Sequence, residues 1–364
     1  MMFMKSIALI VGNITKTGGT ERATVNLASI LLSLDYKVTI ISLNGNNSVD
    51  CYYDIHENIE QLFLELPMLK SGFTNKIFWY SLYIKRLRKS FKQNHFDIII
   101  GTGHGINSLL PIVSINMKIR LIACEHIAYN SLPFISNLLR GISYRFFDYV
   151  VVLSSFAETK FKYLKNVKKI SNSLSFIPTQ TSDQSSKQLL AIGRLSTVKG
   201  FDRLIKIAAL IKDNYSDWKI RLVGEGELKE QLVKECKALN IDDFIIFAPF
   251  TKNIEQEYLN SSIYLLTSYS EAFPMVLLEA KACGLPIVSF NCPEGPADII
   301  NDGVDGYLIE DGDFKSFADK LSFLMENEVL RKQMSINAKH DSFGYAPDRI
   351  SLEWKSLLDE MLIY

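Results

Sequence analysis

Cysteine is scarce in this chain of 364 residues, and its five copies stand far apart. No two of them form a C-x-x-C pair, and no histidine lies at metal-ligand spacing from any of them. We therefore expect neither a structural zinc site nor a disulfide framework, and this usage is typical of a reducing cytoplasm. The five are Cys51, Cys124, Cys236, Cys283 and Cys292.

Long hydrophobic runs are lacking as well. A helix needs roughly 18 consecutive apolar residues to cross a bilayer, and no run in the chain reaches that length. The N-terminal stretch MMFMKSIALIVGN has the length of a short signal peptide, but it leads into Gly12 without a small-residue cleavage site. We interpret it as the first buried strand of the fold.

Net charge is absent too, with 40 Lys and Arg residues against 40 Asp and Glu. The balance is uneven along the chain, because residues 1–180 hold 20 basic against 11 acidic residues and residues 181–364 hold 20 against 29. We expect the basic half to meet an anionic surface or a long anionic substrate. The alternative is that the two halves attract one another across a cleft. Nucleic acid is not an expected partner.

Short apolar stretches alternate with amphipathic helical stretches along the chain. The alternation pauses over residues 172–188, which are rich in Ser, Thr and Gln, and then restarts. Strands separated by helices indicate parallel sheets that helices cover on both faces. We predict an α/β fold of two tandem Rossmann-like domains facing across a cleft. Its parts are an N-terminal domain (1–175), a linker (176–188), a second domain (189–348) and a C-terminal helix (349–364), with the option of packing back on the first domain.

Two glutamates in the segment SYSEAFPMVLLEAKACG stand where a strand gives way to a helix. Pro274 suits the first position of this helix, Glu271 lies on the turn before it, and Glu279 lies about a turn and a half further along. The free N–H groups of a helix start bind anions, and a carboxylate accepts two hydrogen bonds from vicinal hydroxyls. The segment therefore suits a diphosphate and sugar hydroxyls. The alternative is that Glu271 caps the helix and Glu279 faces water.

Two cations, Arg194 and Lys199, stand five residues apart at another strand-to-helix turn, just before Gly200. Both side chains are able to reach one diphosphate leaving group there. Such cations stabilise the negative charge that develops when a sugar–phosphate bond breaks, and so they lower the barrier. Surface cations on a loop are an equally good interpretation of the spacing alone.

The segment TKTGGTERATVNLA places a glycine pair, Gly18 and Gly19, before a helical pattern. Glycine permits close backbone approach to a phosphate, and Thr20 is a candidate cap for the helix that Glu21 opens. The pattern is neither G-x-G-x-x-G nor a Walker A motif. By itself it is a weak indication of phosphate binding.

Glu125 and His126 follow a further strand, in the segment ACEHIAYN. His126 is a candidate hydrogen-bond donor to a transferred sugar, and Glu125 is a candidate for orienting the acceptor or acting as its base. The alternative is structural, since a lone histidine after a strand more often has a structural role. The histidines without supporting context are His56, His95, His104 and His340.

Taken in order, these segments resemble glycosyltransferase family 4, whose members are retaining enzymes with the two-domain GT-B arrangement. The resemblance covers nearly the whole chain and includes G-R-L-x-x-x-K-G, V-G-E-G-E at 223–227, E-x7-E, the trailing A-C-G-L-P and G-P-A-D-I-I-N-D-G-V-D-G. Order and spacing carry it rather than any single motif. The G-G-T-E-R opening and the C-E-H pair look most like bacterial enzymes that build lipid-linked glycans.

The resemblance implies a role for each matching residue of the second domain. Arg194 and Lys199 would hold the donor diphosphate, Glu279 would bind the ribose, and Glu271 would bind the donor sugar. Glu271 would be helped by the backbone of Phe273, Pro274 and Met275.

From the first domain, the resemblance brings Gly18 and Gly19 to the diphosphate and His126 to the transferred sugar. It implies front-face transfer with retained anomeric configuration, in which a donor phosphate oxygen takes the proton of the acceptor. No cofactor and no metal ion are expected. The chain departs from the family at Ala272, where glycine is usual, and this puts the close approach of backbone and sugar in question.

The acceptor is expected on the basic first domain. The segment KIFWYSLYIKRLRKSFKQ, residues 76–93, mixes aromatic side chains with lysines and arginines, and such a helix suits the headgroup region of an anionic membrane. The alternative is a helix with an aromatic core face and a basic water-exposed face. The membrane interpretation makes the acceptor a glycan on a polyprenyl diphosphate and places the protein peripherally on the cytoplasmic face of the inner membrane.

The leading hypothesis is a retaining glycosyltransferase that moves a hexose or N-acetylhexosamine from a UDP-sugar to such a lipid-linked glycan during surface polysaccharide synthesis. One alternative is a nucleotide-sugar 2-epimerase of the same fold, and another is a non-catalytic protein that binds sugar nucleotides. The intact set of cations and glutamates disfavours the non-catalytic protein. The motifs do not encode the donor sugar, the acceptor sugar or the linkage.

Overall fold

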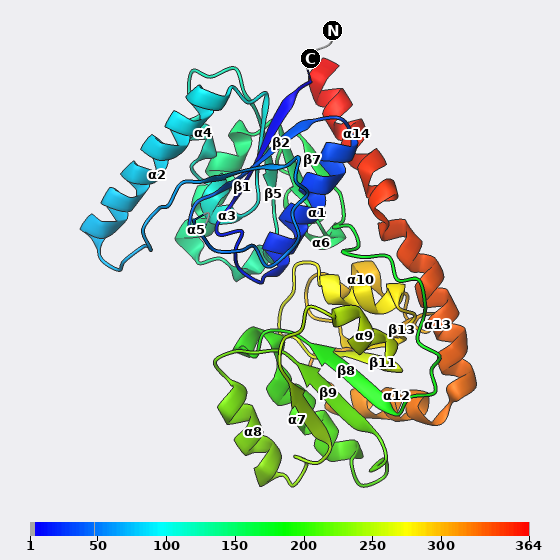
Figure 1. Ribbon diagram of the computed structural model, residues 1–364. Coiled ribbons are helices and arrows are strands. Elements are labelled where there is room, and N and C mark those ends of the chain that lie inside the picture. Colours follow the sequence, from blue (N-terminus) through cyan, green and yellow to red (C-terminus); the bar gives the residue numbers. More distant parts are fainter. Residues whose placement is uncertain (1–3, 47, 364) are drawn as a thin grey trace. The chain divides into compact units, whose positions relative to one another are not determined.

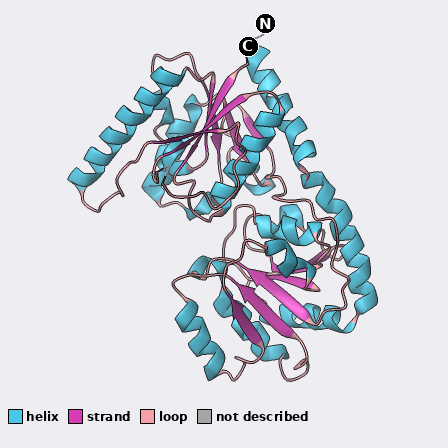
Figure 2. Ribbon diagram, viewed as in Figure 1, coloured by secondary structure: helices cyan, strands magenta, loops and turns pink. Residues whose placement is uncertain are grey.

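The computed structural model describes residues 4–46 and 48–363. The chain divides into two compact units, one formed by Met1–Ser175 with Pro347–Tyr364 and the other by Phe176–Ala346. Each unit is a parallel sheet with helices on both of its faces (Figures 1 and 2). This arrangement confirms the predicted α/β fold with two Rossmann-like units.

The first unit contains a seven-stranded sheet in the order β3-β2-β1-β4-β5-β6-β7. Every neighbouring pair is parallel, and the apolar strand runs are buried because helices cover both faces. Successive residues of β1 point to opposite faces, so Ile7 and Leu9 join one core cluster while Ala8 and Ile10 join the other. The strands are β1 (Ser6–Val11), β2 (Lys37–Ser42), β3 (Glu60–Phe63), β4 (Ile98–Gly101), β5 (Arg120–Cys124), β6 (Tyr149–Val152) and β7 (Val167–Lys169).

The last helix of the chain belongs to the first unit. Its apolar side chains are buried in the core cluster that α1 also enters, and Figure 1 shows α14 in red alongside α1 in blue. The side chains are Ile350, Trp354, Leu357, Leu358 and Met361. The helices of this unit are α1 (Gly19–Ser33), α2 (Phe73–Asn94), α3 (His104–Asn107), α4 (Leu110–Val113), α5 (Phe134–Ser143), α6 (Ser155–Lys160) and α14 (Pro347–Ile363).

The second unit contains a six-stranded parallel sheet in the order β10-β9-β8-β11-β12-β13. Its core cluster gathers side chains from β8, β9, α7 and α12. The strands are β8 (Gln188–Ile192), β9 (Lys219–Val223), β10 (Ile245–Ala248), β11 (Ile263–Leu266), β12 (Ile287–Phe290) and β13 (Gly306–Ile309). The helices are α7 (Phe201–Ile211), α8 (Lys229–Ala238), α9 (Ile254–Leu259), α10 (Met275–Ala282), α11 (Pro296–Ile299), α12 (Phe314–Glu326) and α13 (Glu328–Ser342).

The segment 176–188, predicted as a linker, is fastened to the second unit. The Ser182 hydroxyl donates a hydrogen bond to the Ser261 carbonyl oxygen at 2.5 Å, and the Gln184 amide donates one to the Gly284 carbonyl oxygen at 2.9 Å. Both side chains are almost fully buried. The polar composition that indicates a linker serves here to satisfy buried backbone groups, which need partners away from water.

Candidate active site

The order of strands in the second unit reverses between β8 and β11, which lie side by side as parallel neighbours. The two strands therefore send their following loops in opposite directions, and ligands of doubly wound sheets bind in the crevice at this point. Arg194 and Lys199 follow β8, and Glu271 follows β11. The topology thus brings together segments that are more than 70 residues apart in the sequence.

Lys199 and Glu271 are in direct contact at this point. The Lys199 ammonium lies 2.7 Å from Glu271 Oε1, and the Ser268 hydroxyl donates to the same oxygen at 2.6 Å. The Glu271 side chain is only 9% exposed, and that of Lys199 is 28% exposed. A nearly buried carboxylate requires such partners. Sequence reasoning missed Ser268, whose position three residues before Glu271 on the same turn was the available signal.

The two loops that carry this pair are tied together next to it. The Tyr269 backbone N–H donates to the Val198 carbonyl oxygen at 2.8 Å, and the Arg203 guanidinium lies 3.6 Å from the centre of the Tyr269 ring. Gly200 adopts a positive φ of +62°, and a Cβ there would lie 2.1 Å from the Thr267 carbonyl oxygen. The glycine of the K-G dipeptide therefore permits the close approach of the loops after β8 and β11.

Arg194 does not share the glutamate of Lys199. Its side chain is 74% exposed, and its guanidinium pairs with Glu227 of the V-G-E-G-E segment at 3.2 Å. The structure therefore places the two cations after the same strand but gives each a different carboxylate partner. The predicted joint binding of a diphosphate by both cations stays a prediction.

Glu279 faces the interior of the second unit, not water as the alternative interpretation had it. Its side chain on α10 is buried, and the Tyr258 hydroxyl of α9 donates to Glu279 Oε2 at 2.9 Å. Nothing in the spacing of the sequence points to Tyr258, because the two residues meet only through the packing of α9 on α10. Its predicted ribose contact stays untested.

The start of α10 differs slightly from the expectation, because Pro274 is the N-cap residue and Met275 opens the helix. Phe273 and Met275 are buried on either side of it. A Cβ at Gly295 would lie 2.7 Å from Pro274 Cδ, so the G-P-A-D segment packs directly on this turn. The helix start is thus held in place by a second loop.

α10 also contains a buried cation that sequence reasoning missed. The fully buried Lys281 ammonium lies 2.9 Å from Asp305 Oδ2 and 2.5 Å from the Ile299 carbonyl oxygen, and it also pairs with Asp341. A charge without partners at this depth would cost several kcal/mol. The pairing therefore fixes α10 to the loop before β13 and to α13.

In the first unit, the glycine pair follows the loop after β1 and lies at the start of α1, and the strand order also reverses at β1. Gly18 is the N-cap of α1 and Gly19 its first residue, which corrects the prediction that Thr20 caps the helix. A Cβ at Gly19 would meet nothing within 4 Å. The fold itself therefore does not require glycine there, so any requirement comes from a ligand.

Glu125 is engaged inside the first unit. It is buried, its Oε2 pairs with Arg140 Nη1 of α5 at 3.0 Å, and its Oε1 accepts a hydrogen bond from the Tyr144 hydroxyl. Arg140 is fully buried as well and also donates to Asn137 Oδ1 at 2.6 Å. These contacts give Glu125 a structural role in holding α5 and argue against the predicted acceptor or base role.

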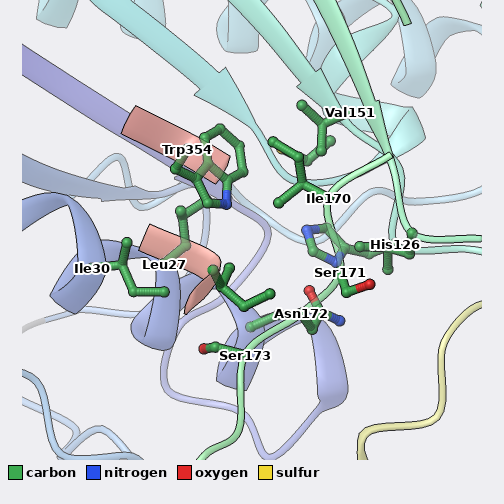
Figure 3. A pocket seen from close by; sticks show the side chains of 13 residues that line it. Leu27, Ile30, His126, Val151, Ile170, Ser171, Asn172, Ser173 and Trp354 are labelled. Atoms are coloured by element: carbon green, nitrogen blue, oxygen red, sulfur yellow. The ribbon is translucent and has the colours of Figure 1, made fainter. Parts of the chain in front are cut away.

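His126 lines a small cavity of about 20 Å³ in the first unit. Figure 3 shows its ring beside Ser171 and Asn172, across the cavity from Trp354 of α14. Its Nε2 atom is enclosed and makes no hydrogen bond to any residue that the structure describes. Burial lowers the pKa of His126 to about 4, so the ring is neutral at physiological pH. A neutral ring keeps one N–H donor, as the predicted sugar contact requires.

Helix α2 contains the segment with the predicted membrane role. The side chains of this segment fall into a group with partners inside the unit and an exposed group. Tyr83, Leu87 and Phe91 are buried in the core, and the guanidinium groups of Arg86 and Arg88 donate to backbone carbonyl oxygens of neighbouring loops. The core face of the alternative interpretation thus holds for the three aromatic and apolar side chains, whereas the two arginines are half-buried and not on a water-exposed face. The exposed aromatic, apolar and basic side chains of this segment are Lys76, Ile77, Phe78, Tyr80, Lys85, Lys89 and Lys92.

Two kinds of feature are absent from the part of the chain that the structure describes. Within residues 4–46 and 48–363, no helix is both long and apolar enough to cross a membrane. In the same ranges, no three or more His, Cys, Asp or Glu side chains gather closely enough to hold a metal ion.

Comparison with known proteins finds the same two units. The family described as Glycosyltransferase Family 4 matches residues 17–171, and the family described as Glycosyl transferases group 1 matches residues 175–341. The pneumococcal O-GlcNAc transferase GtfA, solved with UDP and GlcNAc, shares the fold with a TM-score of 0.82 at 15% identity, covering 99% of each chain.

Three curated relatives match over almost their full length. An uncharacterized glycosyltransferase of Haemophilus influenzae is 32% identical, covering 98% of this chain and 100% of the relative, and the amylovoran biosynthesis glycosyltransferase AmsD of Erwinia amylovora is 30% identical with the same coverage. An N-acetyl-D-galactosaminyltransferase of Campylobacter jejuni, named for a saccharide on PP-undecaprenol, is 29% identical and covers 98% and 99%. The chain therefore belongs to the GT-B glycosyltransferases that join a family 4 domain to a group 1 domain.

Proposed function

We propose that the protein is a retaining glycosyltransferase that moves a sugar from a UDP-sugar to a lipid-linked glycan in bacterial polysaccharide synthesis. The observation that carries the proposal is the contact between Lys199 and Glu271 at the switch point of the second unit. The names of the Erwinia and Campylobacter relatives support the glycan and the lipid carrier. The UDP of the pneumococcal structure supports the nucleotide.

The Lys199–Glu271 contact suggests how a donor is received. A diphosphate carries more negative charge than one carboxylate and competes with Glu271 for the Lys199 ammonium. Glu271, still bonded to Ser268, is then free to accept hydrogen bonds from sugar hydroxyls. During transfer the bond from the anomeric carbon to the phosphate oxygen breaks, and Lys199 stabilises the charge left on the diphosphate. The acceptor oxygen forms the new bond and gives its proton to a phosphate oxygen.

The acceptor side of the proposal rests on the first unit. The exposed lysines of α2 and the apolar side chains of its first turns suit an anionic membrane surface. We place the protein peripherally on the cytoplasmic face of such a membrane, where a polyprenyl-diphosphate-linked glycan would reach this unit. In this proposal a donor phosphate oxygen takes the proton of the acceptor, and the contacts of Glu125 with Arg140 and Tyr144 support that assignment.

The test measures turnover with the purified full chain. UDP-, GDP- and ADP-sugars are compared for release of the nucleoside diphosphate, and the active donor is then supplied with a synthetic lipid-diphosphate saccharide. We expect Lys199→Ala and Glu271→Ala each to reduce transfer at least a hundredfold, because removing one transition-state charge contact costs about 2.7–4 kcal/mol.

Lys332→Ala is the matched control, since Lys332 and Glu328 form an exposed lysine–glutamate pair at 2.7 Å on α13. It should leave transfer unchanged. Full activity in Lys199→Ala or Glu271→Ala would contradict the proposed site. Formation of a new free sugar from the donor without any acceptor would identify an epimerase instead. The anomeric configuration of the product, read by NMR, decides whether transfer is retaining.

A further inference from the structure

Helix α5 carries its apolar side chains on the outside. Its five large apolar side chains are each more than half exposed, and they recur at positions i, i+1, i+4, i+5 and i+8, on one face of the helix. They are Phe134, Ile135, Leu138, Leu139 and Ile142. A helix on the surface of a water-soluble domain normally shows the opposite arrangement. This stripe is therefore expected to meet an apolar partner.

The inward side of α5 is polar and firmly held. Arg140 is fully buried and pairs with Glu125 at 3.0 Å, and its guanidinium stacks 4.4 Å from the centre of the Tyr129 ring. Ser143 is buried on the same side. A buried ion pair specifies one orientation of a helix, because rotation would leave both charges without partners. The apolar stripe is thus presented by a fixed helix.

Exposed basic and aromatic side chains follow α5 in the chain, within residues 145–165, and we call them the border. Tyr163 approaches α5 so closely that a Cβ on Gly141 would lie 3.5 Å from its hydroxyl. Tyr163 and Phe146 are both more than half exposed. Four exposed cations lie in the same stretch of the chain as these two aromatic residues, namely Arg145, Lys160, Lys162 and Lys165. The stretch between Glu125 and Asp148 contains no acidic residue.

We propose that this face of α5 with its border is a membrane-binding surface, separate from α2. Apolar side chains would enter the boundary between headgroups and acyl chains while the neighbouring cations meet anionic headgroups. The charge pattern favours a lipid surface over a second copy of the chain, because like cations would face each other across a symmetric contact. The inference extends the proposed function, in which the acceptor is held in a membrane.

The test is flotation of the full chain with vesicles of phosphatidylcholine, with and without phosphatidylglycerol. We expect Leu138→Gln combined with Ile142→Gln to weaken binding to anionic vesicles at least tenfold. We expect Lys160→Gln combined with Lys162→Gln to weaken binding to anionic vesicles only. Both pairs are exposed, so circular dichroism and thermal unfolding should match the wild type.

The matched control is Val329→Gln combined with Ile336→Gln, which removes two similarly exposed apolar side chains of α13 and should leave vesicle binding unchanged. Full binding by the Leu138/Ile142 variant would overturn the proposal. The proposal would also be overturned if light scattering showed that the wild type is a dimer and that this variant is a monomer. A second copy of the chain would then cover the stripe. Equal binding to neutral vesicles would overturn the role of the cations. Donor turnover by the wild type is measured separately, and its absence counts only against the proposed function.

Discussion

Gly19 and Gly200 differ in the physical reason for which a glycine is needed, and single substitutions separate the two reasons. Gly200→Ala should destabilise the second unit by about 1–3 kcal/mol, because the residue has a positive φ and no space for a Cβ. Gly19→Ala should leave stability unchanged or raise it by up to about 1 kcal/mol, since the position opens a helix and is free of neighbours. Urea unfolding measures both.

The KM for the donor tests whether Gly19 is needed for ligand binding. If the diphosphate approaches the backbone at Gly19, Gly19→Ala should raise the donor KM while the protein stays folded. A folded variant that keeps the KM of the wild type would show that the glycine has no ligand-binding role. A variant that unfolds would contradict the stability expected at this position.

His126 gives the first unit a defined acid sensitivity. Burial lowers its pKa from 6.5 to about 4 in the folded protein. The unfolded chain therefore takes up a proton first as pH falls, so the stabilising contribution is fully present above pH 6.5 and is lost between pH 6.5 and 4. Between pH 7 and 5 this residue should account for about 1–2 kcal/mol of lost stability.

The measurement is urea unfolding at both pH values. His126→Asn should flatten the pH dependence of the unfolding free energy by that amount. Identical pH profiles for the wild type and His126→Asn would show that the ring is not kept neutral by burial.

Among the elements, α10 carries both a predicted ligand residue and the charge that secures the helix. Lys281→Met should destabilise the second unit by about 3–5 kcal/mol, because it leaves Asp305 buried without its cation. Lys332→Met breaks an exposed pair on α13 and should cost less than about 1 kcal/mol. Denaturant unfolding followed at Trp218, which is buried in this unit, distinguishes the two.

A double variant checks the reason for this cost. Lys281→Met with Asp305→Asn removes both charges and should recover part of the stability. If the double variant were less stable than Lys281→Met, the unpaired carboxylate would not be the cause.

For the molecule as a whole, the division into two units predicts which unit loses stability when the last helix is altered. Trp354→Ala should cost the first unit about 3–5 kcal/mol, because a large buried side chain is lost from its core. The second unit should keep its own transition. Leu352→Ala, at an exposed position of the same helix, should change neither. Calorimetry resolves the transitions, and a shift of the second one would contradict the division.

Much of the fold followed from periodicity, because strands buried on both faces read as continuous apolar runs such as the one at Ser6–Val11. The same alternation predicted two parallel-sheet units and the helix at the C-terminus. The prediction of the linker was less accurate. Polar composition indicates a loop, but it does not show whether the loop will form hydrogen bonds to buried backbone groups, as Ser182 and Gln184 do.

In the candidate site, too, some features could be predicted from the sequence and others could not. By itself the sequence determined that Lys199 and Glu271 each stand at a strand-to-helix turn and that the chain resembles its family, since turns, caps and motifs depend on neighbouring residues. Only the tertiary structure decided that the two meet, that Glu125 is taken by Arg140, and that α5 turns its apolar face outward. Such partnerships depend on which strands pair and which helices pack, and these contacts join residues far apart in the chain.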